Sequence, residues 1–318
     1  MLKFIFSEQF LISMILFATP IIFAAFGALV SKKAGILNIN IEGTMSVAAL
    51  AGGLVSFATQ SWFVGLLSAL ITGVVMAFVF AFFTMKMKTD NILSGIALNT
   101  LASGLTIYIL YAVIGVKGDS SLNPSVLIPH LKIPLLSKIP IIGEAFFGQN
   151  ILVYVAVLVV LLLAFMLNRT KFGTHLKAVG HNEEAAKSVG INTRKIKIVA
   201  LVIAGILAGF GGAYLSMVYL SYFSAGMVAG RGFIGIAAEA MGQGQPLPTL
   251  LFALLFGAFD YFAVGAQTVL SFPYELLNTL PYLMTIIALV IFAVIKKVSR
   301  KKHVLNKGGE ENETQSMV

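Results

Sequence analysis

Long apolar stretches separated by short polar segments dominate the chain as far as residue 295. A helix needs roughly 20 apolar residues to cross a bilayer, with about 17 to 25 tolerated. Stretches that approach or reach this length lie at residues 10–30, 36–57, 62–85, 92–114, 151–167, 198–223, 227–241, 247–270 and 274–295. The pattern therefore predicts an all-α, polytopic integral membrane protein with about nine transmembrane helices, within a range of about eight to ten.

Two of these stretches are interrupted by polar residues. Residues 36–57 begin with the polar run from Asn38 to Gly43, and residues 227–241 are short and carry Arg231 and Glu239. Irregular backbone at membrane depth persists only where it is buried in protein or lines a water-filled cavity. We therefore expect one or two broken or re-entrant helices beside a cavity.

Composition supports a membrane protein and excludes most alternatives. Of the 318 residues, 58% are hydrophobic and 11% are charged, whereas soluble domains carry about 25% charged residues. A soluble enzyme and a disordered chain are therefore excluded. Cysteine is absent, which also excludes a disulfide framework and a cysteine-ligated metal site.

The basic residues predict how the chain is oriented. If Lys32 and Lys33 are placed inside and the chain is threaded alternately, most of the 22 basic residues fall in cytoplasmic segments. This places the N-terminus outside, a loop at 115–150 outside, and a loop at 168–197 inside. The charges mark loops at one membrane face, not a single surface for nucleic acid. The sequence therefore predicts a permease domain at 1–295 and a disordered cytoplasmic tail at 296–318, which is basic and then acidic. We expect a multi-pass protein of the cell membrane.

The loop at 168–197 contains a short helix with capping signals at both ends. Asn182 is a good N-cap, and Glu183 and Glu184 follow in the first turn, where acidic side chains suit the helix dipole. Gly190 can take the left-handed position after the last turn. The residues alone leave two interpretations open, a docking element for a cytoplasmic partner or a well-capped connector.

Three motifs resemble those of a known family. From Arg169 the loop reads Arg-Thr-x-Phe-Gly-x-x-Leu-x-Ala-Val-Gly-x-Asn-x-x-Ala-Ala-x-x-x-Gly-Ile, which resembles the cytoplasmic loop of ABC importer permeases for branched-chain amino acids, simple sugars and nucleosides. The segment 33–43 is similar to the nucleoside-permease form, and Gly230-Arg231-Gly232 resembles a motif before a late membrane segment. Together these matches extend from about residue 32 to residue 248.

The resemblance implies a permease subunit that is driven by ATP on another chain. It implies that a coupling helix docks in a groove of an ABC ATPase subunit through Asn182, Glu183, Glu184, Ala185, Ala186, Lys187 and Gly190. The implied partners are a second permease (hetero- or homodimer), an extracellular solute-binding lipoprotein and membrane lipid. The sequence contains no Gly-Lys dipeptide, so the phosphate-binding loop is absent. We expect this chain to bind no cofactor, with ATP and Mg on the ATPase. The resemblance ranks nucleosides first as substrate, then simple sugars, then branched-chain amino acids.

Ionisable groups at membrane depth are costly and are therefore candidates for function. The substrate-pathway candidates are Asn38, Asn40, Glu42, Arg231, Phe233 and Glu239. Glu42 and Arg231 are expected to form an ion pair, which could be structural or could contact the ligand. Gly205 and Gly209 predict close helix packing.

A second function remains open at this stage. Asp260 lies in the middle of the apolar stretch 247–270, and with Glu239 it could serve an ion-gradient-coupled secondary transporter. An enzyme is not expected, because no nucleophile motif occurs and the four histidines lie scattered in loops and the tail. We assign no catalytic residue and no metal site.

Overall fold

The computed structural model describes residues 8–131, 148–269, 283, 286–287 and 290. The chain divides into two compact units, Met1–Phe262 and Ala263–Val318. The first unit holds almost all of the described residues. The predicted tail at 296–318, nearly all of the predicted helix at 274–295 and residues 132–147 of the loop at 115–150 lie outside the described residues.

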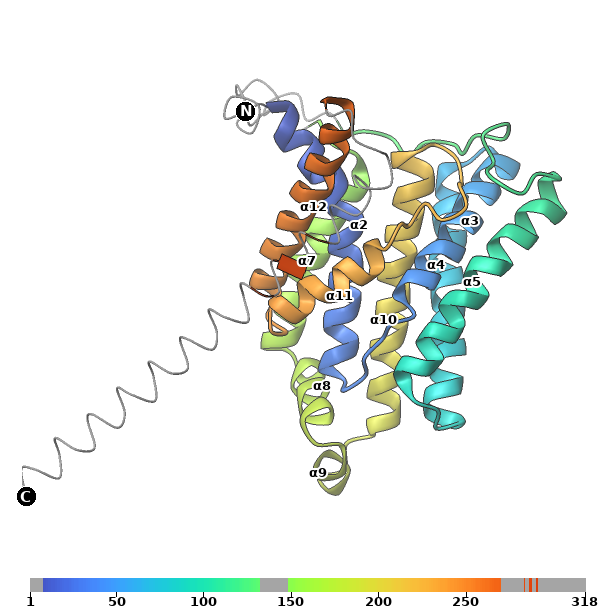
Figure 1. Cartoon of the computed structure of the whole chain (residues 1–318). Coiled ribbons are helices and arrows are strands. Elements are labelled where there is room, and N and C mark those ends of the chain that lie inside the picture. The colour runs from blue at the N-terminus through green and yellow to red at the C-terminus, as the bar shows by residue number, and fades with distance from the viewer. Residues whose placement is uncertain (1–7, 132–147, 270–282, 284–285, 288–289, 291–318) are drawn as a thin grey trace, which may run out of the picture. The chain divides into compact units, whose positions relative to one another are not determined.

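The described part is helical, with two isolated β-bridges, Asp119–Ser224 and His130–Asn150, and no strand. Its helices are shown in Figure 1. They are α2 (Glu8–Lys33), α3 (Ile41–Thr59), α4 (Trp62–Ala81) with a π-helical turn η1 (Phe82–Lys86), α5 (Asn91–Ile114), α7 (Ile151–Arg169), α8 (Lys171–His181), α9 (Glu183–Ser188), α10 (Thr193–Tyr214) with a π-helical turn η2 (Leu215–Tyr219), α11 (Arg231–Met241) and α12 (Pro246–Val269).

Seven segments of the described chain are long and apolar enough to cross a membrane. They are Phe10–Lys33, Ile41–Thr59, Trp62–Lys86, Asn91–Ile114, Ile151–Arg169, Thr193–Tyr219 and Pro246–Val264. The all-helical membrane fold is therefore confirmed. The expected helix at 227–241 is corrected to α11, which has 11 residues and is too short to span. The expected helix at 36–57 begins only at Ile41, because residues 36–40 form a turn.

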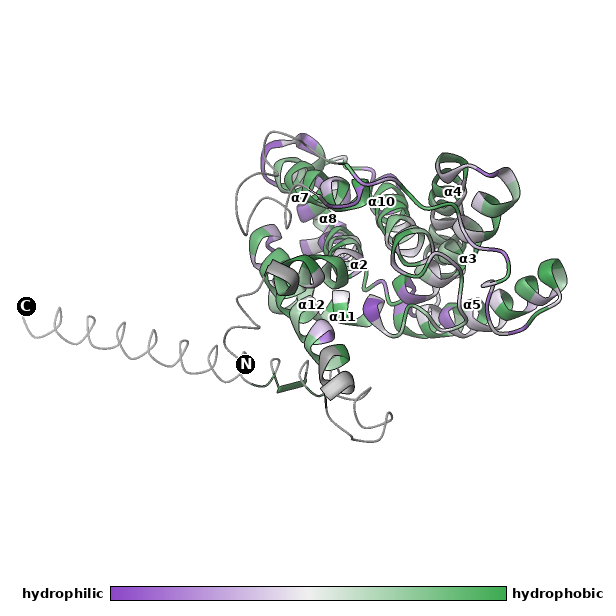
Figure 2. Ribbon diagram, turned by 90° about the horizontal axis from the view of Figure 1, so that it is seen from above, coloured by the Kyte–Doolittle hydropathy of each residue, from purple (hydrophilic) through white to green (hydrophobic). Residues whose placement is uncertain are grey.

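Three helices form the interior of the first unit. The most apolar windows of α2, α3 and α10 are 72%, 61% and 67% buried, against 28% for α4 and 22% for α5. Viewed from above, the long helices are predominantly hydrophobic (Figure 2). Because the exposed residues of α4 and α5 are also apolar, we infer that these helices face lipid or another membrane subunit.

Helix α10 packs closely against α4 through small residues. A Cβ atom at Gly205 would overlap the carbonyl oxygen of Gly73, and one at Gly209 would lie 2.9 Å from the carbonyl oxygen of Ala69. The predicted close packing of Gly205 and Gly209 is therefore confirmed. Glycine is required here because the two backbones meet directly.

One end of the bundle carries the lysine-rich segments. Helices α8 and α9 lie at the end where α2 finishes (Figure 1). We call this the basic end, and define it by the ends of α2 and η1 (Lys32, Lys33, Lys86) together with α8 and α9.

Candidate functional site

The short helix α11 begins against the carboxylate of Glu42 in α3. Glu42 Oε1 accepts a hydrogen bond from the backbone N–H of Gly230, and Oε2 accepts one from Gly232, both at 2.8 Å. The first amides of a helix have no partner within the helix and carry a partial positive charge. Glu42 therefore caps α11 from another helix.

Glycines make this cap possible. Gly230 has φ +77°, which favours glycine, and a Cβ at Gly232 would lie 2.6 Å from Glu42 Oε2. The Gly-Arg-Gly motif thus brings the backbone close to a buried carboxylate. The expected Glu42–Arg231 ion pair is wrong, because Glu42 holds the backbone on either side of Arg231.

Arg231 instead pairs with Asp260 in α12. Arg231 Nη2 lies 2.9 Å from Asp260 Oδ2, and both side chains are buried. The contact is an ion pair without hydrogen-bond geometry, since Asp260 Oδ2 has no hydrogen-bond partner among the described residues. Arg231 Nη1 donates to the carbonyl oxygens of Met227 and Val228, at 3.2 and 3.4 Å.

Aromatic rings complete the surroundings of Arg231. Its guanidinium lies 5.4 Å from the ring centroid of Tyr219 and 6.0 Å from that of Phe17, and these two rings meet edge to face. A cation over an aromatic face is stabilised by about 0.5 to 2 kcal/mol. The charge of Arg231 is therefore compensated on several sides at membrane depth.

The other end of α11 is tied to α2. Glu239 Oε2 accepts a hydrogen bond from Lys32 Nζ at 2.7 Å. The Glu239 side chain is 1% exposed and that of Lys32 is 47% exposed, so the pair joins the interior to the surface at the basic end. Arg231 and Glu239 therefore have different partners and do not pair with each other.

The turn before α3 carries two buried amides with unused acceptors. Asn38 Nδ2 donates to Ser31 Oγ at 3.5 Å, and Asn40 Nδ2 donates to Thr44 Oγ1 at 3.1 Å. Neither Oδ1 atom has a hydrogen-bond partner among the described residues. Buried polar atoms are normally satisfied, so these two enclosed oxygens are exceptions within the described residues.

Asn99 of α5 holds the same turn, and our sequence analysis missed it. Its Nδ2 donates to the carbonyl oxygen of Ile39 at 3.0 Å, and its Oδ1 accepts from the N–H of Gly43 at 2.8 Å. A signal was available, because an amide inside an apolar span is expected to hydrogen-bond to another segment. Phe233, the remaining predicted pathway residue, is 46% exposed near the start of α11.

The predicted short helix of the cytoplasmic loop is present as α9. Asn182 Oδ1 accepts a hydrogen bond from the N–H of Ala185 at 3.0 Å, and Gly190 has φ +82°. Both capping signals therefore act as predicted. Ala186 is buried, whereas Glu184, Ala185 and Lys187 are exposed, and Val189 just after the helix is 74% exposed.

Glu183 anchors α9 to the start of α10. Its carboxylate forms ion pairs with Lys197 and Lys187 and accepts a hydrogen bond from Thr193 Oγ1 at 3.0 Å. These donors, Lys197 first, lower the pKa of Glu183 to about 2. Glu183 is therefore ionised at physiological pH, and it holds α9 in place.

Helix α8 was not expected, and it joins α9 to the membrane helices. It begins at the N-cap Thr170, whose Oγ1 accepts from the N–H of Gly173 at 3.2 Å. Near its end, a Cβ at Gly180 would lie 3.0 Å from the nitrogen of Gly35 and would overlap the carbonyl oxygen of Lys33. The backbone of α8 thus rests directly on the turn between α2 and α3.

The described residues contain no group of three or more His, Asp or Glu side chains that could hold a metal ion. The polar groups form two sets, an intramembrane set around α11 and a set around α8 and α9. The turn at 34–40 connects them.

Comparison with known proteins agrees with this geometry. Residues 10–292 match the family described as "Branched-chain amino acid transport system / permease component". The chain is 33% identical over 290 residues to NupC, a nucleoside ABC transporter permease protein of Lactococcus lactis, covering 88% of this chain and 90% of NupC. It is 30% identical over 292 residues to NupQ, a guanosine ABC transporter permease protein of Bacillus subtilis, covering 87% and 90%.

A third relative is named for a different substrate. TsgC13 of Haloferax volcanii, whose name assigns it provisionally to glucose, is 31% identical over 307 residues, covering 89% of this chain and 90% of TsgC13. The family match spans seven apolar helices, the broken segment at α11 and the loop that holds α9. This chain therefore belongs to the permease family of the branched-chain amino acid transport systems.

Proposed function

We propose that this chain is the membrane-spanning subunit of an ATP-binding cassette importer that carries a nucleoside. The observation that carries the proposal is the likeness to NupC across 88% of this chain. The segment 33–43, which resembles the nucleoside-permease form, lies at the turn held by Asn99. A simple sugar is the second candidate, because TsgC13 is nearly as similar.

In this proposal α9 receives the movement of a separate ATPase. Its exposed face, with Glu184, Lys187 and Val189, is available for docking. The ion pair of Glu183 with Lys197 ties α9 to the start of α10, and the backbone contact at Gly180 ties α8 to the turn after α2. A push on α9 would therefore reach the turn at 34–40 and, through Glu42, the start of α11.

The turn at 34–40 and α11 are proposed to line the solute path. Phe233 offers an exposed ring on which a base can stack. The Oδ1 atoms of Asn38 and Asn40 are enclosed and unpaired within the described chain, and in this proposal a movement of the turn exposes them as acceptors for ribose hydroxyls. Broken helices at membrane depth are expected beside a water-filled cavity. In this assignment Glu42, Arg231 and Glu239 position α11 and do not bind the solute themselves.

The proposed assembly contains a second permease, two ATPase domains and an external solute-binding lipoprotein. The basic end is proposed to face the cytoplasm, because lysine and arginine are enriched in cytoplasmic loops. Helix α12 begins at the basic end, where Gly244 and Pro246 lie beside Lys33, so the predicted helix at 274–295 would return the C-terminus to the cytoplasm. The chain itself would bind no ATP and no Mg.

An ion-gradient-coupled transporter is less well supported. It would need Asp260 or Glu239 to take up and release an ion during the cycle. Each carboxylate already has a cation at close distance, Arg231 for Asp260 and Lys32 for Glu239. These contacts favour a structural role for both carboxylates.

Uptake by the complete assembly in proteoliposomes tests the proposal. Radiolabelled guanosine should enter only with ATP present, an uncoupler should have no effect, and excess glucose should not compete. Uptake that persists without ATP and collapses with the uncoupler would contradict the ABC assignment. Competition by glucose but not by other nucleosides would shift the substrate to a sugar.

Variants on α9 test the docking assignment separately. Glu184→Arg should abolish uptake and reduce co-purification of the ATPase while the amount of inserted protein stays normal. Lys171→Glu, at the start of α8, is the control, because it also changes charge by two units at an exposed position of the basic end. Normal uptake by Glu184→Arg would show that α9 is only a connector.

A further inference from the structure

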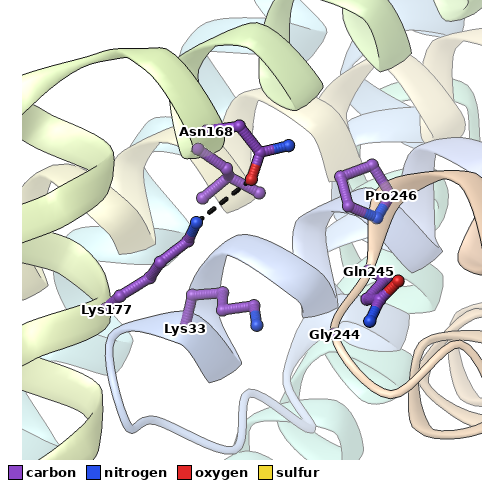
Figure 3. Close-up of a pocket in the computed structure, with 7 residues that line it drawn as sticks. Lys33, Asn168, Lys177, Gly244, Gln245 and Pro246 are labelled. Atoms are coloured by element: carbon purple, nitrogen blue, oxygen red, sulfur yellow. Dashed lines mark hydrogen bonds between the residues drawn. The ribbon is translucent and has the colours of Figure 1, made fainter.

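Two adjoining cavities at the basic end are lined by lysines from separate helices. One, of about 330 Å³, is lined by Lys33, Leu167, Asn168, Lys177, Gly244, Gln245 and Pro246 (Figure 3). The other, of about 520 Å³, is lined by Lys32, Lys33, Lys177, Ala178, Gly180 and His181. Both therefore share the end of α2 and the middle of α8.

The two shared lysines lack a carboxylate partner. No described Asp or Glu lies within ion-pair distance of Lys33 or Lys177. Lys177 Nζ donates only to the neutral Asn168 Oδ1, at 3.1 Å. Glu239 lies nearby but is buried, and it is held by Lys32 at 2.7 Å. A Cβ at Gly244 would lie 2.8 Å from Lys33 Nζ and 3.6 Å from Glu239 Oε1, so this one carboxylate offsets part of the charge of Lys32 and Lys33. With Lys177 added, the cavity keeps a net positive charge.

The rest of the lining adds donors and no acidic side chain. Asn168 and Gln245 present carboxamides, and their side chains lie around the cavity with those of Lys33 and Lys177 in Figure 3. Gly244 has φ +70°, and a Cβ there would lie 2.8 Å from Lys33 Nζ. The amine of Lys33 therefore lies close to the backbone of Gly244.

The positive-inside rule explains why lysines occur at this end, but it does not explain why they converge. Lysines that only mark topology repel one another and can spread into solvent. Here Lys33 and Lys177 come from segments far apart in the sequence and face one cavity with an apolar wall at Leu167. Basic cavities between membrane helices on the cytoplasmic side are suited to anionic head groups.

We propose that the cavity shared by Lys33 and Lys177 binds a phosphate group. The group comes either from an anionic phospholipid of the leaflet at the basic end or from a phosphate-bearing solute. The two amines supply charge, and the carboxamides of Asn168 and Gln245 supply further hydrogen bonds. The proposal does not depend on which solute the permease carries.

The test uses the full-length chain assembled with its companion subunits. Retention of phosphatidylglycerol is measured by native mass spectrometry, and binding of inorganic phosphate is measured by calorimetry in phosphatidylcholine nanodiscs. The double variant Lys33→Gln/Lys177→Gln should weaken binding by about tenfold or more, because hydrogen bonds to charged groups are among the strongest. The control Lys171→Gln/Lys195→Gln removes the same charge from exposed positions of the same end and outside both cavities.

The two probes identify the source of the phosphate. Retention of phosphatidylglycerol without phosphate binding assigns the site to lipid, and phosphate binding assigns it to a solute. Equal loss in both double variants, or no binding of either probe by the unchanged protein, would overturn the proposal.

A footprint on the unchanged protein avoids any folding defect of the variants. Acetylation of lysines is followed by mass spectrometry with and without each probe. Lys33 and Lys177 should be protected by the bound probe, whereas Lys171 should react equally in both states. Unchanged reactivity of Lys33 would also contradict the proposal.

Discussion

The ion pair between Arg231 and Asp260 gives a quantitative test of how α11 is held. Asp260→Asn removes the charge that faces Arg231 and leaves a nearly isosteric amide. Removing one partner of a buried ion pair costs about 3–5 kcal/mol. Arg231 keeps two carbonyl acceptors and two aromatic faces, so we expect the lower part of this range, about 3 kcal/mol.

The opposite single variant should cost less. Arg231→Gln leaves Asp260 without its cation, but a carboxyl can take up a proton and lose its charge, whereas a guanidinium cannot. The double variant Arg231→Gln/Asp260→Asn removes both charges together. It should therefore be more stable than the sum of the two single losses implies, by about 1–3 kcal/mol of coupling.

The assay is denaturant unfolding of the protein in nanodiscs, with uptake measured per folded assembly. The double variant should keep ATP-driven uptake, because the pair positions α11 and carries no ion in our proposal. Additive losses in the cycle would refute the energetic reasoning. A double variant that folds normally and transports nothing would support the ion-coupled alternative.

Three further perturbations test other contacts. Gly180→Ala should displace α8 from the turn after α2, so that uptake falls while ATP hydrolysis continues; Gly104→Ala, at a glycine with open space around it, should change neither activity. Glu42→Ala should destabilise the protein by about 2 kcal/mol in chemical unfolding, since two part-buried amides lose their acceptor. The low pKa of Glu183, about 2 in the folded protein, means that its contribution to stability is present above the ordinary carboxyl range and is lost only as pH falls from there toward 2. The protection of the α9 amides against hydrogen exchange, relative to an unfolded chain at the same pH, should therefore fall between about pH 4 and pH 2. Glu183→Gln should remove that fall.

Local signals were enough to predict α9 and most of the long helices. Asn182 and Gly190 act within a few residues of their own position, so their roles follow from chain chemistry alone. The length of each apolar stretch likewise predicts a membrane-spanning helix, because lipid imposes one thickness on every helix. These predictions needed no knowledge of neighbouring segments.

The missing features depend on contacts between distant segments. The partner of Arg231 could not be found by spacing, because Glu42 and Asp260 are both far from it in the sequence and only packing decides between them. Helix α8 was hidden by Gly173 and Gly180, which weaken a helical pattern in sequence. In the structure both glycines lie where α8 meets other backbone, so the residues that obscured the helix are those that its packing requires.

The charged contacts of α11 follow from its length. In a helix of 11 residues, about four unpaired amides and four unpaired carbonyls at the two ends are more than a third of the backbone polar groups, and lipid satisfies none of them. Glu42 supplies acceptors at the first end, and Lys32 fixes Glu239 near the last. Helix α11 also packs directly on α2, where a Cβ at Gly235 would lie 2.6 Å from Ala24 Cβ and 2.7 Å from the nitrogen of Ala25. The polar contacts therefore satisfy the ends of α11, and close packing of small residues fixes its middle against α2.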